Sequence, residues 1–270
     1  MIWIFFVLFI VLFLSLALLI QKFIFNRYIR QLFSNSPMVS SIKFSYTQIE
    51  NLPEPVKKYF KLVLKEGQPY ISYVRLKHNG YFRTKPNGKW VQIKGQEYFT
   101  AYIPGFIWKG STKLFHALDM FIAGKGKLFV YLFRIIRILK SEGEETDRGE
   151  LLRWLAEAVV FPTALLPNDY ILWRPINQTS SRLILSYNDF QLECQVFFKD
   201  TGEIYQIESN RFYMNDKKLH KWIEYFSGYK RYNDILVPTV LEVSWDLPEG
   251  IFNYVRFNIT KLEFDKPYCY

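Results

Sequence analysis

The chain has 270 residues, of which 50% are hydrophobic and 19% aromatic, and its formal net charge is +10 at pH 7. This length and apolar content allow a sizeable buried core, while the two cysteines, Cys194 and Cys269, exclude a disulfide-rich scaffold and a zinc site made of cysteines alone. The basic residues are spread along the chain, which fits either a solvated surface or attraction to anionic lipid headgroups.

The first predicted element is an apolar N-terminal helix. Between Ile2 and Ile20 the only polar residue is Ser15, and a helix over this stretch covers about 28 Å at about 1.5 Å per residue, close to the hydrocarbon thickness of a bilayer. No basic residue precedes the stretch and no small-x-small cleavage site ends it, unlike a cleavable signal peptide. We therefore predict a transmembrane anchor over residues 1–24, in a single-pass protein of the cell membrane.

A basic segment follows the anchor and is predicted to be a juxtamembrane linker over residues 25–45. Lys22, Arg27, Arg30 and Lys43 lie on this side of the anchor with no acidic residue among them, which favours a body on the cytoplasmic side. The opposite side stays open, because large domains can translocate regardless of charge. Residues 46–270 are predicted to form a single β-rich globular domain.

The body begins with a short helix and then changes to strands. In LPEPVKKYFKLVL, residues 52–64, apolar side chains recur at helical spacing after two prolines, and Gly67 ends the helix. From Tyr70 the apolar period becomes two, which is typical of strands. The predicted strands cover residues 70–84, 89–102, 106–109, 114–122, 127–139, 170–173, 182–187, 190–198, 203–213, 219–232, 235–247 and 251–264.

One strong amphipathic helix pattern interrupts the strands, in GELLRWLAEAVVFPTALLP at residues 149–167. The preceding SEGEETDRGE predicts a solvated polar loop in which Asp147 caps the helix and Glu150 completes a capping box. The helix is expected to run to about Val160, before Pro162. These elements predict a mainly β (α+β) fold, with a large curved antiparallel sheet or half-barrel wrapped around this central helix.

The long polar side chains of this helix, Glu150, Arg153 and Glu157, are three and four residues apart and share one face. Two interpretations remain open. The row is either a solvent-exposed set of ion pairs or points into a cavity, where Arg153 could hold a polar group of a ligand or pair with a strand residue. Catalysis by the two carboxylates is disfavoured, because Arg153 between them would keep both ionised.

The tryptophans of the body fall mostly in predicted strands, where they pack in a core or line a cavity. The sheet carries no RNP-like sequence, so no nucleic-acid partner is predicted. The candidate ligand-binding residues are therefore Glu150, Arg153, Trp154, Glu157, Trp108 and Trp173.

The other reactive residue types form no recognisable site. His78, His116 and His220 are isolated in separate strands, and no phosphate-binding loop is present in the sequence. Cys194 shares its predicted strand face with apolar neighbours, which indicates a small buried hydrophobic side chain. We predict no catalytic residue, no metal and no cofactor.

Three segments carry a family resemblance: LPEPVKKYF, then GELLRWLAEAVVFPTALLP, then GYKRYNDILVPTVLEVSWDLPEGIFNYVRFNITKLEF. Together they resemble an uncharacterised bacterial family of membrane-anchored proteins, one of the domains of unknown function, over nearly all of the body. The order of elements is also similar to the half-barrel of lipoprotein carriers, a curved antiparallel sheet around helices with an apolar interior. The second resemblance concerns architecture, which does not imply a function.

The sequence as a whole predicts a membrane-anchored, non-enzymatic binding protein for an apolar or lipid-like ligand, with membrane lipids as partners. Apolar residues on both faces of several strands are the reason, because they suggest a cavity wall. A membrane-tethered structural or interaction module with a filled core is the alternative, and an uncharacterised hydrolase is the third possibility.

Overall fold

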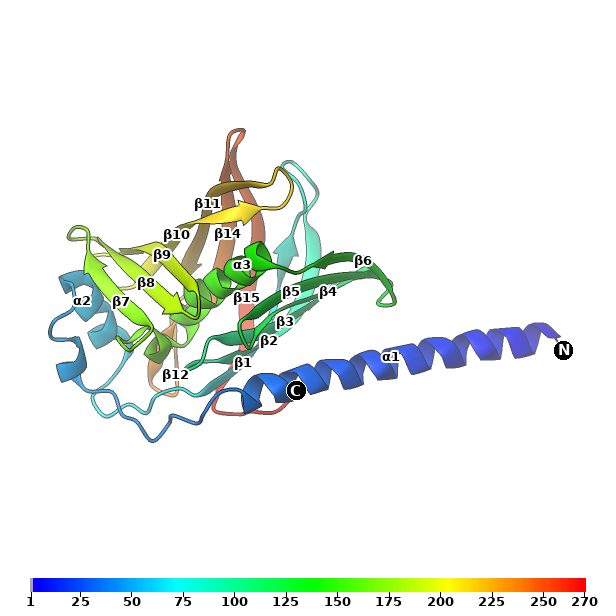
Figure 1. Ribbon diagram of the computed structural model, residues 1–270, viewed down its shortest axis with the longest axis horizontal. Helices are drawn as coiled ribbons and strands as arrows, with labels where there is room; N and C mark the ends of the chain where they lie inside the picture. The colour runs from blue at the N-terminus through cyan, green and yellow to red at the C-terminus, as the bar shows by residue number, and fades with distance from the viewer. Residues whose placement is uncertain (1) are drawn as a thin grey trace.

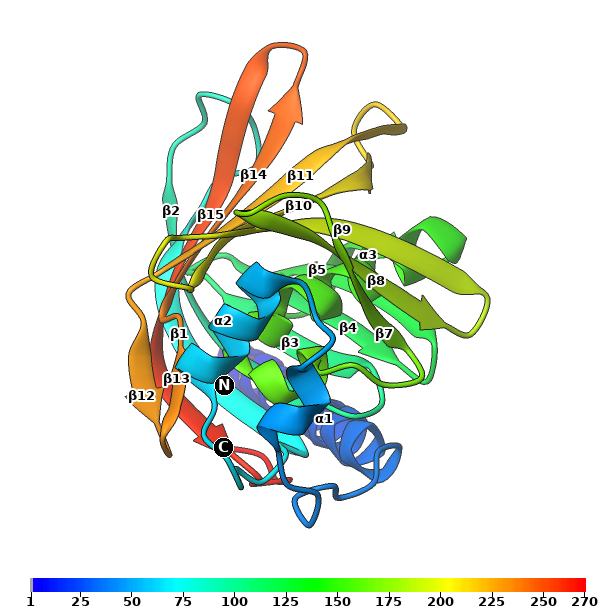
Figure 2. The ribbon, with the colours of Figure 1, turned by 90° about the vertical axis from the view of Figure 1, so that its left-hand side faces the viewer.

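The computed structural model describes residues 2–270, apart from the side chains at positions 2, 7, 10, 11, 13 and 14. A long helix, α1 (Ile2–Ser34), extends from one side of a body in which a curved sheet surrounds the helix α3 (Glu144–Glu157) (Figure 1). Seen from the end, the sheet curls around α3, and α2 (Glu54–Val63) lies across the opening nearest the viewer (Figure 2). The mainly β prediction, a large curved antiparallel half-barrel around a helix, is confirmed.

The half-barrel is one sheet of 13 strands in the order β6-β5-β4-β3-β2-β1-β15-β14-β11-β10-β9-β8-β7. Two wings built from sequence neighbours therefore meet where β1 pairs with β15. The first wing comprises β1 (Tyr73–Phe82), β2 (Val91–Thr100), β3 (Gly105–Ser111), β4 (Phe115–Ile122), β5 (Lys125–Leu132) and β6 (Ile136–Ser141). The second comprises β7 (Ile171–Pro175), β8 (Ser180–Tyr187), β9 (Phe190–Phe198), β10 (Ile204–Tyr213), β11 (Lys218–Ser227), β14 (Val240–Leu247) and β15 (Gly250–Phe264).

The seam between β1 and β15 leaves no room for a side chain at Gly80. A Cβ there would contact the backbone oxygen of Arg256 and the ring of Phe257 in the facing strand. A glycine inside a strand often marks such a close approach of two backbones. The glycine thus lets the two wings meet with a continuous ladder.

Two predicted strands are each split by a turn. Residues 127–139 were predicted as one strand, but the chain reverses between β5 and β6 through Phe133 and Arg134, both with positive φ. Neither residue type favours that conformation, so the turn carries no sequence signal. Likewise β11 is followed by a separate two-stranded sheet of β12 (Lys230–Tyr232) and β13 (Ile235–Val237), and Pro238, which has no amide hydrogen, separates β13 from β14.

The helix α3 begins earlier than predicted, at Glu144 instead of after Asp147. Asp147 is buried, and its carboxylate accepts hydrogen bonds from the Gly126 amide at 2.6 Å and the Lys125 ammonium at 2.9 Å, both in β5. The prediction that Asp147 caps the helix from a solvated loop is therefore wrong. Asp147 lies inside α3, and its carboxylate binds the strand β5 instead of the amides of the helix start. The helix then tightens into two short 3₁₀ turns, Ala158–Val160 and Pro162–Leu165.

The N-terminal helix does not end where the linker was expected. Residues 25–34 continue α1, and Phe25, Ile29, Leu32 and Phe33 are buried in a cluster that includes Tyr98 of β2 and Ile107 of β3. An apolar face at helical spacing explains this packing, since the basic residues of the segment occupy the other positions. A 3₁₀ turn, Tyr46–Ile49, with a capping box at Ser45, then leads to α2.

Within the described residues, no helix combines the length and apolar character that crossing a bilayer requires. The transmembrane anchor predicted over residues 1–24 is not confirmed.

Candidate functional site

The middle of α3 carries a buried charged centre around Arg153. Its guanidinium donates three hydrogen bonds of 2.7 Å: from Nε to Glu157 Oε1, from Nη1 to Asp119 Oδ2 of β4, and from Nη2 to Glu97 Oε1 of β2. All four side chains are about nine-tenths buried. Arg153 is therefore held by three carboxyl groups, of which Asp119 and Glu97 come from the first wing of the sheet.

Aromatic rings enclose the same guanidinium. Its central carbon lies 4.8 Å from the ring centre of Phe106 and 5.3 Å from that of Trp108. Trp108 Nε1 donates a hydrogen bond of 2.8 Å to His78 Nε2, so this ring nitrogen carries no proton. Burial, with Arg153 nearby, lowers the pKa of His78 to about 3 and keeps the imidazole neutral.

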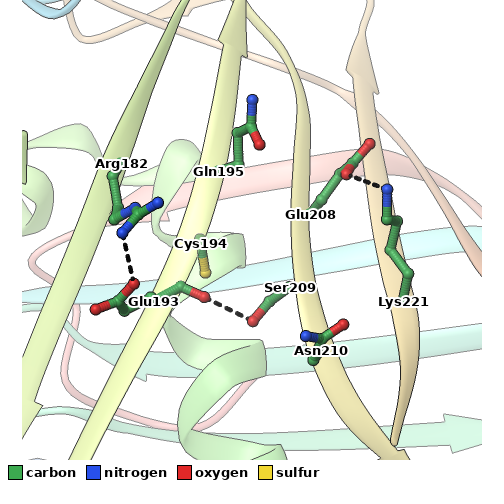
Figure 3. A pocket seen from close by; sticks show the side chains of 8 residues that line it. All are labelled: Arg182, Glu193, Cys194, Gln195, Glu208, Ser209, Asn210 and Lys221. Carbon is green, nitrogen blue, oxygen red and sulfur yellow. Dashed lines mark hydrogen bonds and ion pairs between the residues drawn. The ribbon is translucent and has the colours of Figure 1, made fainter. Parts of the chain in front are cut away.

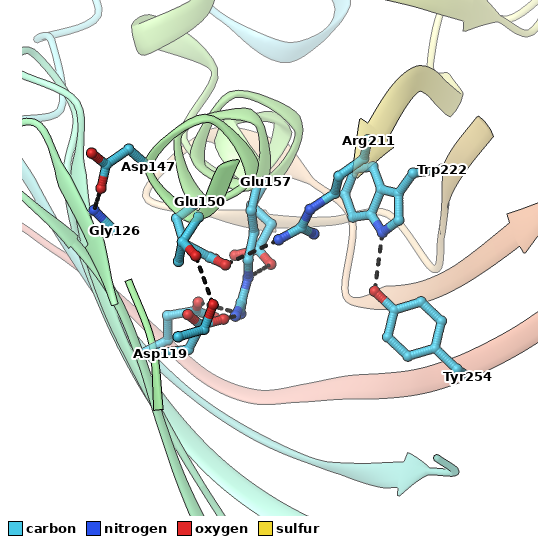
Figure 4. Close-up of polar contacts among 12 residues, drawn as sticks. Asp119, Gly126, Asp147, Glu150, Glu157, Arg211, Trp222 and Tyr254 are labelled. Atoms are coloured by element: carbon cyan, nitrogen blue, oxygen red, sulfur yellow. Dashed lines mark hydrogen bonds and ion pairs between the residues drawn. The ribbon is translucent and has the colours of Figure 1, made fainter. Parts of the chain in front are cut away.

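A second buried ion pair joins α3 to the other wing. Arg211 of β10 donates from Nη2 to Glu150 Oε1 at 3.1 Å and stacks over Trp222, whose Nε1 donates to the Tyr254 hydroxyl at 3.0 Å (Figure 4). Gly149 makes room for this arrangement, because a Cβ there would lie 3.2 Å from Arg211 Nε.

These side chains form one acid-rich group, called here the carboxyl cluster: Glu97, Asp119, Glu150, Glu157 and Glu224 with Arg153 and Arg211. Five carboxyls thus face two guanidinium groups. Burial and like charge nearby raise the pKa of Glu150 to about 8, and raise the pKa values of Glu97 and Glu224 well above the usual range. If these three carboxyls hold protons, the buried charge balances.

Unpaired oxygens in the cluster support this proton count. Among the described residues, Asp119 Oδ1 and Glu150 Oε2 are buried without a hydrogen-bond donor, as are both carboxyl oxygens of Glu224. The Asp119 and Glu150 carboxyls lie within hydrogen-bonding reach of each other, so a proton held between them gives each group a partner (Figure 4). The expectation that Arg153 keeps both Glu150 and Glu157 ionised is therefore corrected for Glu150, where burial outweighs the guanidinium charge.

A pocket of about 270 Å³ leads from the surface to the Glu150–Arg211 pair. It opens at the start of α3, between the β5–β6 and β10–β11 hairpins. Its lining includes apolar side chains, Leu128, Phe212 and Met214, and charged ones, Glu142, Glu145, Glu150, Arg211 and Lys217. We take this opening, called here the mouth pocket, as the candidate binding site.

A second pocket, of about 280 Å³, lies between β9 and β10, where their pairing stops after Gln195 and Glu208 (Figure 3). Its charged lining is already paired, with Arg182 bound to Glu193 at 3.3 Å and Lys221 to Glu208 at 2.9 Å. Cys194 is buried there as predicted, and burial raises the pKa of its thiol to about 12, which makes it unreactive. Unlike the mouth pocket, this pocket does not reach the carboxyl cluster.

The structure brings four of the six candidate residues together. Glu150, Arg153, Glu157 and Trp108 meet in or against the carboxyl cluster, and Glu150 also reaches the mouth pocket. The three side chains of the row, Glu150, Arg153 and Glu157, are about nine-tenths buried, which excludes the solvent-exposed row of ion pairs.

Trp154 and Trp173 lie elsewhere in the core. The Trp154 indole donates to the Thr100 carbonyl and the Trp173 indole to the Leu165 carbonyl, each at 2.9 Å. Both rings are buried among other apolar side chains.

Sequence reasoning missed the strand partners of the helix. Each acidic partner is a lone carboxyl inside an apolar strand segment, a pattern that signals a buried charge with a partner. These segments are QEYF, LDMF and WIEYF, which contain Glu97, Asp119 and Glu224.

A protein-family model matches most of the chain. Residues 43–257 match the family of unknown function DUF6544. The chain belongs to this family. The expected membership of a domain-of-unknown-function family is thereby confirmed, and no curated protein matches this DUF6544 chain.

Solved structures with a similar fold share little sequence with this DUF6544 chain. A LolA superfamily protein from Nitrosomonas europaea is 9% identical, with 78% of this chain and 92% of that chain covered and a TM-score of 0.45. A putative outer membrane lipoprotein-sorting protein domain from Vibrio parahaemolyticus is 10% identical, with 72% and 86% covered and a TM-score of 0.42. A DUF1329 family protein from Desulfovibrio piger is 12% identical, with 72% and 86% covered and a TM-score of 0.41.

Proposed function

We propose that this DUF6544 protein is a membrane-attached, non-enzymatic binding protein for a lipid-like ligand, and that the mouth pocket is its binding site. The observation that carries the proposal is that the lining of this pocket combines apolar with charged side chains. Leu128, Phe212 and Met214 offer a surface to a hydrocarbon chain, while Arg211 and Lys217 offer hydrogen-bond donors to a polar head.

The size of the pocket limits what it encloses. At about 270 Å³ it lies near the lower end of the usual range of about 300–1,000 Å³ for small-molecule sites. It therefore accommodates the polar head and the first part of a chain, and the remainder of the ligand lies along the rim.

Membrane attachment through α1 is part of the proposal. The part of this helix before Phe25 exposes large apolar side chains, which water solvates poorly and a bilayer accepts. They include Trp3, Phe5, Phe6, Phe9, Leu12, Leu16, Leu19 and Phe23. Lys22, Arg27 and Arg30 follow this apolar part, which favours a body on the cytoplasmic side.

The rival proposal is a membrane-tethered module whose interior is filled. The core next to α3 favours it, because Phe99, Trp154 and Phe161 are almost completely buried against one another. A protein of this kind uses its outer surface and needs no ligand.

Ligand retention distinguishes the two proposals. We expect the full chain to co-purify with a lipid-like molecule, and Met214→Asp, which replaces an apolar lining side chain by a charge, to lower the bound fraction about tenfold. Native mass spectrometry and lipid extraction measure both values. Leu219→Asp is the matched control, since Leu219 is exposed on the neighbouring strand and does not line the pocket. Absence of any bound lipid, with an unchanged thermal midpoint when lipids are added, would favour the filled module.

Membrane attachment has its own test. We expect the full chain to float with phosphatidylcholine vesicles in a density gradient, and the double variant Leu12→Arg, Leu16→Arg to stay at the bottom, because arginine is costly in the hydrocarbon region. Met38→Arg, at an exposed residue outside α1, should float like the unmodified chain. Equal flotation of all three proteins would contradict attachment through α1.

A further inference from the structure

The tip of the β5–β6 hairpin lies beside α1 at the point where that helix leaves the body. Gln21 of α1 donates a side-chain hydrogen bond to the Arg134 carbonyl at this tip. In Figure 1 the hairpin and the free part of α1 extend from the body on the same side. Residues 25–34 of α1 pack on the sheet, whereas the described side chains of the apolar residues before Gln21 are exposed, apart from the half-buried Ala17.

The surface around this tip combines exposed apolar side chains with basic ones, and is called here the hairpin face. Phe133, Ile136 and Leu114 expose 59%, 57% and 51% of their surface. Basic side chains surround them, and none of these makes an ion pair with a described carboxylate: Lys22, Lys109, Lys113, Arg134 and Arg137.

The charged residues of this part of the chain are almost all basic. Between Gly105 and Ser141 the only acidic residue is Asp119, which is buried against Arg153. The Lys109 ammonium lies 3.8 Å from the ring centre of Phe25, and burial together with Arg134 and Lys22 lowers its pKa to about 8. An anionic group at this place would complement a set of positive charges that the protein leaves without counter-charge.

The backbone of the turn supports a role for its side chains. Phe133 and Arg134 are the two central residues of a turn, with φ of 49° and 66°, closed by a hydrogen bond from the Ile135 amide to the Leu132 carbonyl. Such loops favour Asn-Gly, and a bulky residue with positive φ is unusual. A phenylalanine and an arginine in these positions present one aromatic and one basic side chain outward despite an unfavourable backbone conformation.

We propose that the hairpin face docks on anionic phospholipid headgroups. The inference rests on the proposed attachment through α1: when the part of the helix before Gln21 is embedded, Phe133 and Arg134 lie at the level of the headgroups. Aromatic side chains are favoured at that level, and basic side chains are attracted to an anionic leaflet. The hairpin then fixes the orientation of the half-barrel relative to the bilayer, which a single helix leaves free.

The test follows amide hydrogen exchange in residues 127–141 of the full chain, bound to vesicles of phosphatidylcholine with or without phosphatidylglycerol. We expect exchange at the hairpin tip to be about tenfold slower when phosphatidylglycerol is present, and the difference to disappear at high salt. Arg134→Gln should reduce this protection about fivefold, the effect of one basic side chain near an anionic surface. Phe133→Ser should reduce it at least as much.

Ile251→Ser is the matched control, because Ile251 is 58% exposed at the β14–β15 hairpin, far from α1 in Figure 1. Its protection at residues 127–141 should equal that of the unmodified chain. Flotation with equal exchange in both kinds of vesicle would overturn the docking alone, whereas a chain that floats with neither would overturn the membrane attachment and the docking with it. Protection that appears without vesicles and rises with protein concentration would show that the edge strand β6 pairs with a second copy, and would also overturn the proposal.

Discussion

Arg153→Met is expected to lower the free energy of unfolding by about 3–5 kcal/mol, measured by urea denaturation at pH 7. The substitution keeps most of the side-chain volume but leaves Glu97, Asp119 and Glu157 without the guanidinium that each of them contacts at 2.7 Å. A buried carboxylate without a positive partner is strongly unfavourable. Arg153 thus acts mainly in holding α3 to the first wing of the sheet.

Arg182→Met provides the comparison. Its ion pair with Glu193, at 3.3 Å, joins half-exposed side chains, so its loss should change stability by less than about 1 kcal/mol. The double variant Arg153→Met, Glu157→Gln should regain part of the lost stability, since one of the stranded carboxylates is gone. A loss at Arg153 no larger than at Arg182 would contradict the buried charged centre.

Stability should fall as pH rises from 6.5 to 7.5, by about 1.4 kcal/mol or more. The folded-state pKa of Glu150 is about 8, above its ordinary value near 4.5, so the unfolded chain has already released a proton that the folded chain keeps. This contribution is complete below the unfolded-state pKa and is lost as pH approaches 8. Asp119, Arg153 and Arg211 are the charged groups that face Glu150, from β4, α3 and β10.

Glu97 and Glu224, whose pKa values are also raised, add to this fall. The other shifted groups titrate mainly outside this interval. His78 and His116, with pKa values lowered to about 3 and about 4, change stability below about pH 6.5, and Lys109, with a pKa near 8, does so mainly at higher pH. Glu150→Gln should remove about 1.4 kcal/mol of the fall per pH unit, because the amide cannot ionise and still donates to Asp119. Glu54→Gln, at an exposed residue, should leave the slope unchanged. A slope that is the same in the Glu150 variant and the unmodified chain would contradict the retained proton.

The sequence was informative where structure depends on neighbouring residues. Alternating apolar residues predicted most of the strands, and the 3.6-residue pattern around Leu151 and Leu155 predicted the central helix, because both patterns follow from burial of one face. The spacing of Glu150, Arg153 and Glu157 also identified the face of α3 that carries the cluster.

The features that could not be predicted from the sequence depend mainly on contacts between distant segments. Glu97 and Asp119 precede Arg153 by 56 and 34 positions, so no local spacing connects them. The turn at Phe133 and Arg134 has no glycine, asparagine or proline to mark it. The packing of α1 against β2 and β3 was missed, because the basic residues of residues 25–34 indicated a linker.

The pairing of β1 with β15 has a consequence for the order of folding. Within each wing most strands pair with their sequence neighbours, but the seam joins residues as far apart as Val74 and Phe264. Contacts of such long sequence separation form slowly, since a long loop must close before they are made. The cluster takes Glu97 and Asp119 from one wing and Arg211 and Glu224 from the other, so its carboxyls remain hydrated and ionised until the seam closes. Closure of the seam is then the step at which the folding chain takes up protons from the solvent.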